Sequence, residues 1–272
     1  MNVTLITGAS GGIGEEVAYR LAERKNNLLL VARNSEKLAQ LCKKIEAETG
    51  VHAQYISADL SKPDAPQFVY EESRRMGLEV DLLINNAGIG SGGVFTELTL
   101  QSELELVQLN ISSLIALTHL YLQDMQRRKT GVIINVASMT AFMPVPYMAT
   151  YAASKMFVRS FTEAITQEAL PFGVHVMLFC PGLTKTNFNA AAGIDNKTGK
   201  GLSSDYEQAE WQTAKEVAKE LISALEQRKN FAVSGRKNRM GAKVLAMLPN
   251  FMIARQLAKR YQKKIVQQCT GK

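Results

Sequence analysis

The sequence predicts a doubly wound α/β fold, in which helices cover both faces of a parallel sheet and form a three-layer α/β/α sandwich. Short apolar segments alternate with longer amphipathic ones along most of the chain. The short segments are apolar at consecutive positions, which is typical of strands buried on both faces of a parallel sheet. Right-handed crossovers between such strands distribute the helices over the two faces.

The elements follow in chain order. The first strand, at 2–6, carries Val3, Leu5 and Ile6 and turns on glycine into an amphipathic helix at 12–24. Further strands are expected at 27–32, 52–57, 81–85, 131–137, 174–179 and 231–233. Further helices are expected at 35–49, 101–128, 151–170 and 214–227, because their apolar residues recur at helical spacing.

Two segments fall outside this alternation. Residues 184–212 form a long stretch with Gly, Ser and Asn directly after a strand, where a lid over an active site is expected. Residues 241–266 predict two short amphipathic helices broken at Pro249. We therefore expect one α/β domain at 1–240, including the lid, and a basic helical extension at 241–272.

The composition is that of an ordinary globular protein, with 46% hydrophobic and 21% charged residues in a chain of 272. The N-terminus lacks the basic start and long apolar run of a signal peptide. No apolar run approaches the ~20 residues of a membrane span. Cys42, Cys180 and Cys269 lie far apart without a CxxC neighbour, so neither a disulfide framework nor a metal site is expected. These features predict a reducing, cytoplasmic location.

The positive charge is concentrated in the C-terminal part. The net charge is +7, yet no acidic residue follows Glu226, whereas Lys and Arg recur as far as Lys272. The preceding part is therefore acidic overall. An acidic body without a recognition motif disfavours nucleic-acid binding.

A glycine-rich turn, Thr7-Gly-Ala-Ser-Gly-Gly-Ile-Gly14, joins the first strand to the first helix. Glycines allow tight turning and close backbone approach, while the helix N–H groups and dipole attract an anion such as a phosphate. A P-loop would end in GK[ST], but Glu15 follows here, which disfavours nucleoside triphosphate hydrolysis. An ordinary βα loop is the alternative interpretation of the turn.

The end of the second strand favours NADP over NAD. An NAD enzyme places Asp or Glu there to bind the adenosine ribose, whereas this chain has Arg33, which suits the additional 2′-phosphate. Asp59 ends the third strand, and residues 85–88, Asn-Asn-Ala-Gly, end the fourth. Both positions lie at carboxyl ends of strands, where α/β sheets bind ligands.

The most specific chemical feature is Tyr151-x-x-x-Lys155 at the start of a helix. This spacing places the phenol and the ammonium on one helix face. A free tyrosine has a pKa near 10, and a nearby lysine favours the phenolate and lowers that pKa. Ser138 ends the preceding strand and offers a hydroxyl to the same substrate oxygen. A helix surface pair is the alternative for the tyrosine and lysine alone.

Together these motifs resemble those of short-chain dehydrogenases/reductases. Residues 7–14 are similar to the TGxxxGxG fingerprint, and residues 85–88 to the NNAG motif. The family's other marked positions are matched by Asn110, Ser138, Tyr151, Lys155, Pro181, Gly182, Thr184 and Thr186. The motifs follow the expected order from residue 1 to residue 233.

The resemblance implies a Rossmann-fold catalytic domain that passes hydride between NADP(H), with NAD(H) as the alternative, and a carbonyl/alcohol pair. It implies that Tyr151 donates the proton in reduction and that Ser138 stabilises the substrate oxygen. Lys155 lowers the pKa of Tyr151 and binds the nicotinamide ribose, and Asn110 kinks its helix to hold a water that relays protons to Lys155. The implied cofactor contacts are Gly8, Ser10, Gly12, Ile13, Gly14, Arg33, Asp59, Leu60, Asn86, Ala87, Gly88, Tyr151, Lys155, Pro181, Gly182, Thr184 and Thr186.

The substrate and the partners are less closely specified. The apolar stretch 139–148 favours a lipophilic substrate such as a 3-oxoacyl or steroid-like ketone, with packing against the lid as the alternative. A non-catalytic NAD(P)-binding regulator or scaffold is the competing function, which the complete set of Ser138, Tyr151 and Lys155 disfavours. The resemblance implies a dimer or tetramer.

The basic tail has several interpretations. It alternates apolar residues with basic ones, including Lys243, Arg255, Lys259, Arg260, Lys263 and Lys264. It could lie peripherally on an anionic membrane, cap the substrate pocket, or dock on a partner subunit. A helical pair packed on the domain with a solvated basic face is the plainest reading.

Overall fold

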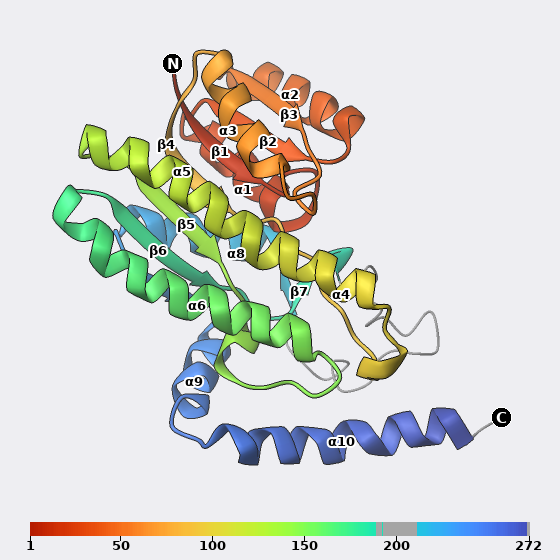
Figure 1. Ribbon diagram of the computed structural model, residues 1–272. Helices are drawn as coiled ribbons and strands as arrows, with labels where there is room; N and C mark the ends of the chain where they lie inside the picture. The colour runs from red at the N-terminus through yellow and green to blue at the C-terminus, as the bar shows by residue number, and fades with distance from the viewer. Residues whose placement is uncertain (189–191, 193–210, 271–272) are drawn as a thin grey trace.

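The computed structural model describes residues 1–188, 192 and 211–270, and it contains the predicted parallel sheet (Figure 1). Its strands are β1 (Asn2–Thr7), β2 (Leu28–Ala32), β3 (Ala53–Ser57), β4 (Glu79–Asn85), β5 (Val132–Val136), β6 (His175–Cys180) and β9 (Phe231–Val233). They lie in the order β3-β2-β1-β4-β5-β6-β9, and every neighbouring pair is parallel. The doubly wound fold is confirmed.

Helices cover both faces of this sheet. One face carries α1 (Gly12–Glu23), α2 (Ser35–Thr49) and α8 (Ala214–Glu226). The other carries α3 (Ala65–Arg75), α5 (Ser113–Arg128) and α6 (Ala149–Ala169). Consecutive strand residues serve opposite faces: Leu28 and Leu30 pack beneath the first group, whereas Leu29 and Val31 pack beneath the second. Burial on both sides explains why the strands are apolar throughout.

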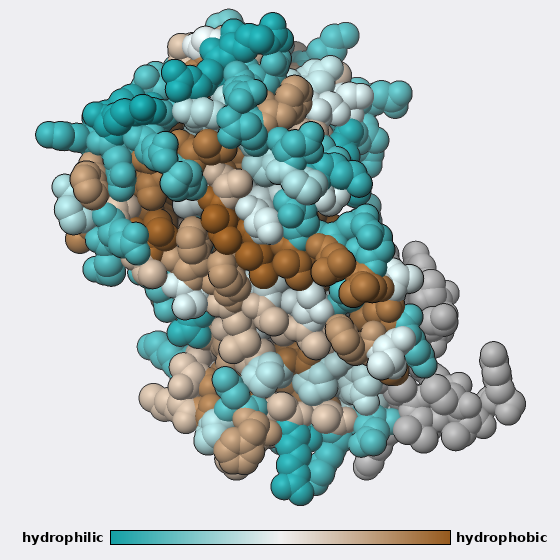
Figure 2. Space-filling model, viewed as in Figure 1, coloured by the Kyte–Doolittle hydropathy of each residue, from teal (hydrophilic) through white to brown (hydrophobic). Residues whose placement is uncertain are grey.

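The predicted helix at 101–128 is divided into three parts. The chain forms α4 (Leu100–Val107), a π-helical turn η2 (Gln108–Ser112) and then α5. Figure 2 shows an apolar band that follows α5 and α4 across the surface. Leu100 and Leu104 of α4 are among its exposed side chains.

Helix α3 was not predicted. Its buried residues are Ala65, Pro66, Val69 and Ser73, so Val69 is its one large aliphatic core residue and the helical apolar period is weak. The proline in the first turn is the available sequence signal, because proline is favoured there.

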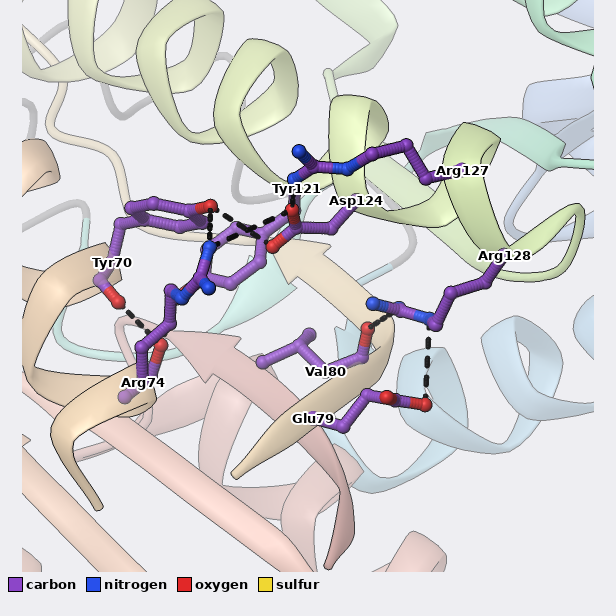
Figure 3. A network of polar contacts seen from close by, with 9 residues as sticks. Tyr70, Arg74, Glu79, Val80, Tyr121, Asp124, Arg127 and Arg128 are labelled. Atoms are coloured by element: carbon purple, nitrogen blue, oxygen red, sulfur yellow. Dashed lines mark hydrogen bonds and ion pairs between the residues drawn. The ribbon is translucent and has the colours of Figure 1, made fainter. Parts of the chain in front are cut away.

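Polar contacts help to hold α3 on α5 (Figure 3). The Tyr70 hydroxyl donates to Asp124 Oδ2 at 3.0 Å and accepts from Arg74 Nη1 at 2.9 Å. Beneath them, the hydroxyls of Ser73 and Tyr121 share a buried hydrogen bond of 2.9 Å. These polar contacts hold α3 in place, although the helix buries few apolar side chains.

The two segments outside the alternation are only partly described. Most of the predicted lid at 184–212 lies outside the described residues. Its described ends form β7 (Thr184–Lys185) and β8 (Gln212–Thr213), a short parallel pair that the sequence did not predict. The C-terminal part forms α9 (Arg236–Leu245) and α10 (Asn250–Thr270), so the break at Pro249 is confirmed. However, α9 begins before residue 241, so the predicted division between 240 and 241 falls inside this helix, and α10 is long rather than short.

Two further findings concern single residues and membrane spans. Cys42 and Cys180 are buried, free thiols, and burial raises their pKa values to about 11 and about 12 respectively. Cys269 and the basic side chains of Arg260, Lys263 and Lys264 lie outside the described side chains. Across the described residues, no helix combines the length and apolarity required to cross a bilayer.

Candidate active site

The glycine-rich turn forms a close-packed cradle between β1 and α1. Gly12 has a positive φ of 60°, and Thr186 lies against it, 3.1 Å from the position of an added Cβ. A Cβ on Gly14 would overlap the carbonyl oxygen of Gly8. The N-cap residue of α1, Gly11, provides no side-chain hydrogen bond, so backbone N–H groups at this helix end are available to an anion.

Thr7 and Asn86 join this turn to the end of β4. Asn86 Nδ2 donates to the Thr7 carbonyl at 2.9 Å, and Thr7 Oγ1 accepts from the N–H groups of Asn86 and Ala87 at 3.0 and 2.9 Å. These bonds bring Asn86 and Ala87 alongside Gly8, whereas Gly88 lies toward Asn110 and Lys155. The positioning role of Thr7 was missed, although this residue lies within the predicted fingerprint.

Arg33 and Asp59 lie at the ends of β2 and β3, on the rim beside the turn. Burial alone would raise the pKa of Asp59, but hydrogen bonds from Ser61 and the positive charges of Arg33 and Lys62 lower it below its usual value. The Arg33 side chain is exposed and therefore accessible to a ligand. Leu60 is buried next to Asp59, and its carbonyl accepts from Ser113 Oγ at 2.5 Å.

Three hydroxyls meet where β5 ends and α6 begins. Tyr151 is 7% exposed, and the hydroxyls of Ser138 and Thr140 face its phenol. Burial raises the pKa of Tyr151, and these two hydroxyls lower it less than burial raises it. In the chain by itself the pKa is therefore raised, not lowered as predicted. Although Thr140 Oγ1 faces the phenol, it is buried without a partner in full hydrogen-bonding geometry among the described residues, which leaves a polar atom for a ligand at this point.

Lys155 lies one helical turn after Tyr151 and is also buried. Its Nζ donates to the Val136 carbonyl at 3.0 Å and lies 6.0 Å from the centroid of the Tyr151 ring. Burial lowers the pKa of Lys155 to about 8, and the neighbouring Cys180 offsets this effect only in part. Its ammonium is therefore poised to exchange a proton not far above neutrality.

Asn110 occupies the π-helical turn η2 and is almost fully buried. Its Oδ1 accepts from the Ile89 N–H at 3.0 Å, while its Nδ2 donates to the Ile89 carbonyl at 2.9 Å and to Ser154 Oγ at 3.1 Å. A Cβ on Gly88 would lie 3.1 Å from Asn110 Oδ1 and 3.4 Å from Lys155 Nζ. The amide, the lysine and the loop after β4 thus converge, and the predicted irregularity of the helix is present.

The segment after β6 completes the same rim. The Pro181 carbonyl accepts from the Met139 N–H at 2.9 Å, which ties this segment to the residue after Ser138. Thr184 is buried, and its hydroxyl donates to the Gly182 carbonyl at 2.9 Å. Thr186 lies against the glycine-rich turn, as described above.

The structure brings two further elements to the site. Phe188 packs on Tyr151 with ring centroids 5.6 Å apart. Tyr261 of α10 is buried, meets Tyr147 edge to face at 6.2 Å, and belongs with Leu257 to the apolar cluster around Tyr151. Sequence reasoning named capping of the pocket by the tail as one alternative, but no sequence signal identified Tyr261 as a residue of the site. Tyr147 and Tyr261 lie far apart in the sequence, so their contact depends on the tertiary fold.

A family model described as short chain dehydrogenase matches residues 2–197, which is well over half of the chain. This protein belongs to the short-chain dehydrogenase family. The matched motif positions of this short-chain dehydrogenase lie at the ends of β1, β4, β5 and β6 and at the starts of α1 and α6, with Asn110 in the π-helical turn η2.

Several curated relatives are similar to this short-chain dehydrogenase. A 17-beta-hydroxysteroid dehydrogenase type 3 from Danio rerio is 35% identical over 182 residues, covering 65% of this chain and 59% of the relative. A ketoacyl reductase, HetN, from Nostoc is 30% identical over 222 residues, covering 81% and 74%. A very-long-chain 3-oxoacyl-CoA reductase from Phaeosphaeria nodorum is 35% identical over 176 residues, covering 63% and 52%. The chain therefore spans about three fifths or less of the first and third of these relatives.

Solved structures include a similar short-chain dehydrogenase from Sphingobium yanoikuyae in complex with NADPH. It is 30% identical, has a TM-score of 0.78, and the alignment covers 86% of this chain and 87% of that one. A 7beta-hydroxysteroid dehydrogenase structure has a TM-score of 0.81 over 94% and 96% of the chains, and its 24% identity supports the fold alone.

Proposed function

We propose that this protein is an oxidoreductase that passes hydride between NADP(H) and the carbonyl/alcohol pair of a lipophilic substrate. The observation that carries the proposal is the convergence of Ser138, Thr140 and Tyr151 on one buried point, with Lys155 one helical turn further along and Asn110 bonded to Ser154 of the same helix. A carbonyl oxygen placed there would satisfy the unpartnered Thr140 hydroxyl. The names of the curated relatives support the same reaction class.

The residues fit a dinucleotide. The cradle at Gly12 and Gly14 admits backbone N–H contacts to a pyrophosphate, and Lys155 offers its ammonium to the ribose hydroxyls. When bound, the nicotinamide supplies the hydride. Of the remaining proposed contacts, Ser10 and Ile13 belong to the same turn and helix start, whereas Asp59, Thr184 and Thr186 follow the ends of β3 and β6.

The residues of the chain orient the substrate oxygen and supply the proton that is added to it. Ser138 fixes the substrate oxygen, and Tyr151, whose phenol is protonated near neutral pH, donates the proton to it. Lys155, with a pKa of about 8, gives a proton to Tyr151 and becomes a neutral amine, and Asn110 opens its helix so that a water returns a proton to that amine. These groups are held by helix and sheet before substrate arrives, which is the main contribution of the protein to the rate.

The substrate class is argued from the walls of the site. Val145 and Met148 are buried beside Tyr151, and Met143, Phe188 and Leu257 are packed against them. Such surroundings favour an apolar group next to the carbonyl carbon. The steroid and 3-oxoacyl names of the relatives support substrates of this kind.

The test is NADPH oxidation followed by absorbance at 340 nm. The panel should include a steroid ketone, a long-chain and a short-chain 3-oxoacyl thioester, and a small polar ketone. We expect turnover to rise with the apolar size of the substrate. NADPH binding without turnover of any carbonyl, or turnover limited to the polar ketone, would contradict the proposal; the former would favour a cofactor-binding regulator.

Arg33→Asp is expected to change the choice of cofactor. The exposed guanidinium pairs with the 2′-phosphate of NADPH in our proposal, and a carboxylate would repel that group while accepting from a ribose hydroxyl. Loss of one charge-assisted contact and gain of repulsion correspond to about 100-fold weaker NADPH binding, or ~3 kcal/mol. Fluorescence titration with NADPH and NADH measures this.

The neighbouring variant Lys37→Asp is the control for a general change of charge, because Lys37 is also exposed and lies on α2. Equal weakening of NADPH and NADH by Arg33→Asp would show that the 2′-phosphate contact does not exist.

We also propose that the chain forms a homodimer or a tetramer through the apolar band along α4 and α5 (Figure 2). A second copy of this chain would cover exposed leucines such as Leu100 and Leu104, and a two-fold arrangement pairs the same face with itself. Sedimentation velocity that finds a monomer at micromolar concentration would contradict this.

A further inference from the structure

The C-terminal helices carry an exposed apolar surface with no covering element in the described part of the chain. Six large side chains form it: Met240, Val244, Met247, Leu248, Phe251 and Met252. They are at least 45% exposed, and Met247 reaches 85%. They lie within thirteen consecutive residues at the junction of α9 and α10, so we call them the junction patch. Isolated exposed apolar residues are common, whereas a concentration of this kind indicates an interaction surface.

The charged residues of the two helices that carry the junction patch are all basic. Lys243, Arg255 and Lys259 are exposed within it or next to it, and none has an ion-pair partner among the described residues. No acidic residue follows Glu226 in the sequence. In Figure 2 hydrophilic and hydrophobic side chains alternate along the lower edge of the molecule, where Figure 1 places α9 and α10. The surface therefore suits an occupant that is both apolar and anionic.

The orientation of α10 is fixed by the helix face that packs against the body of the protein. Ile253, Leu257 and Tyr261 recur every four residues, and Ile253 and Tyr261 are buried. Leu257 and Tyr261 pack into the apolar cluster around Tyr151. With this inner face docked on the body, Phe251, Arg255 and Lys259 point outward together, since they lie on the opposite side of the helix.

We propose that the junction patch docks the protein on an anionic membrane surface. The six apolar side chains enter the interface between headgroups and acyl chains, and Lys243, Arg255 and Lys259 bind the anionic headgroups. A second copy of this chain fits less well, because a two-fold contact would bring each basic surface against itself without a carboxylate between. A nucleic acid would leave the protruding apolar side chains without a partner.

Docking in this way places the apolar cluster around Tyr151, where the substrate is proposed to bind, next to the bilayer. The inner face of α10 belongs to the cluster around Tyr151, while its outer face touches lipid. A lipophilic carbonyl compound dissolved in the membrane then has a short path to the site. This consequence rests on the proposed function, whereas the docking itself does not.

The test is vesicle sedimentation with the full chain. Vesicles of phosphatidylcholine alone are compared with vesicles containing 30% phosphatidylserine, at low and at high salt. We expect binding to the anionic vesicles that weakens with salt, and at least tenfold weaker binding to phosphatidylcholine alone. Each basic residue near such a surface contributes roughly a fivefold factor in affinity.

Two double variants test the apolar and the basic residues of this surface separately. Met247→Ser/Phe251→Ser removes apolar anchors, and Lys243→Glu/Arg255→Glu reverses charge; each is expected to weaken binding to anionic vesicles more than tenfold. The matched controls are Leu170→Ser and Lys37→Glu, which change an exposed apolar and an exposed basic residue elsewhere and are expected to bind like the wild type. Far-UV circular dichroism confirms that each variant is folded.

Absence of binding to anionic vesicles, or binding that neither patch variant weakens, would overturn the proposal. A wild-type dimer that Met247→Ser/Phe251→Ser dissociates, without vesicle binding, would instead assign the patch to contact between copies. NADPH turnover of a water-soluble ketone without vesicles should be unchanged in both patch variants. Failure of docking and failure of the proposed oxidoreductase activity are therefore distinguishable.

Discussion

Tyr151→Phe is expected to lower the rate of carbonyl reduction by about 10³-fold while NADPH still binds. The substitution removes one oxygen atom from a buried ring that otherwise keeps its contact with Phe188. Without that oxygen, no remaining group at the convergence of Ser138 and Thr140 has the role of proton donor. A positioned general acid contributes roughly 10²–10⁴-fold to a rate, and the expected loss lies within that range. Stopped-flow or steady-state oxidation of NADPH measures it.

Tyr147→Phe is the matched control for this prediction. Tyr147 lies four residues earlier and packs against Tyr261 at the substrate end, but its hydroxyl is outside the proposed constellation. We expect its kcat to remain within a few-fold of the wild type. If Tyr151→Phe kept its activity, or if the two variants lost equal activity, Tyr151 could not be the proton donor.

Gly14→Ala is expected to abolish tight NADPH binding and to destabilise the fold, whereas Gly11→Ala is expected to do neither. A Cβ on Gly14 would overlap the Gly8 carbonyl oxygen and lie 2.6 Å from Asn86 Nδ2. Both atoms are held in place, because Asn86 is bonded to the end of β1. Overpacking of this kind costs about 1–3 kcal/mol, which corresponds to a decrease in Tm of about 5 °C.

Gly11 provides the comparison within the same turn. Its backbone is extended, with φ 174°, and an added Cβ would meet nothing within 4 Å. Thermal unfolding with and without NADPH separates the two variants: the cofactor should raise the Tm of the wild type and of Gly11→Ala, but not that of Gly14→Ala. An equal NADPH-induced shift in both variants would show that the close contact at Gly14 is not required.

The sequence predicted the sheet because its signals are local. Strands buried on both faces, such as β2 with Leu28 to Val31, are apolar at every position and can be recognised without knowledge of their neighbours. The fingerprint turn and the Tyr151–Lys155 pair are equally local, because fixed spacing determines which side chains share a turn or a helix face. Helix α3 was missed for the same reason, since Val69 alone gives too weak a periodic signal.

Contacts between distant segments could not be predicted in this way. The π-helical turn at Asn110 is accompanied by hydrogen bonds to the backbone of Ile89, which lies 21 residues earlier. The direction of the Tyr151 pKa was also mistaken, because the sequence shows that Lys155 is near but not that both groups lose their water. The free energy of desolvation depends on everything that surrounds a group.

By itself, the sequence determined the layered fold, the dinucleotide turn and the proposed catalytic pair, all of which depend on residues close together in the chain. Only the tertiary structure decided that Thr140 faces Tyr151, that Tyr261 reaches the same cluster, and that the six side chains of the junction patch remain exposed. The physical reason is that burial is a property of the packed molecule. An amphipathic helix such as α10 has two candidate faces, and the protein surface on which it packs selects the one that is buried.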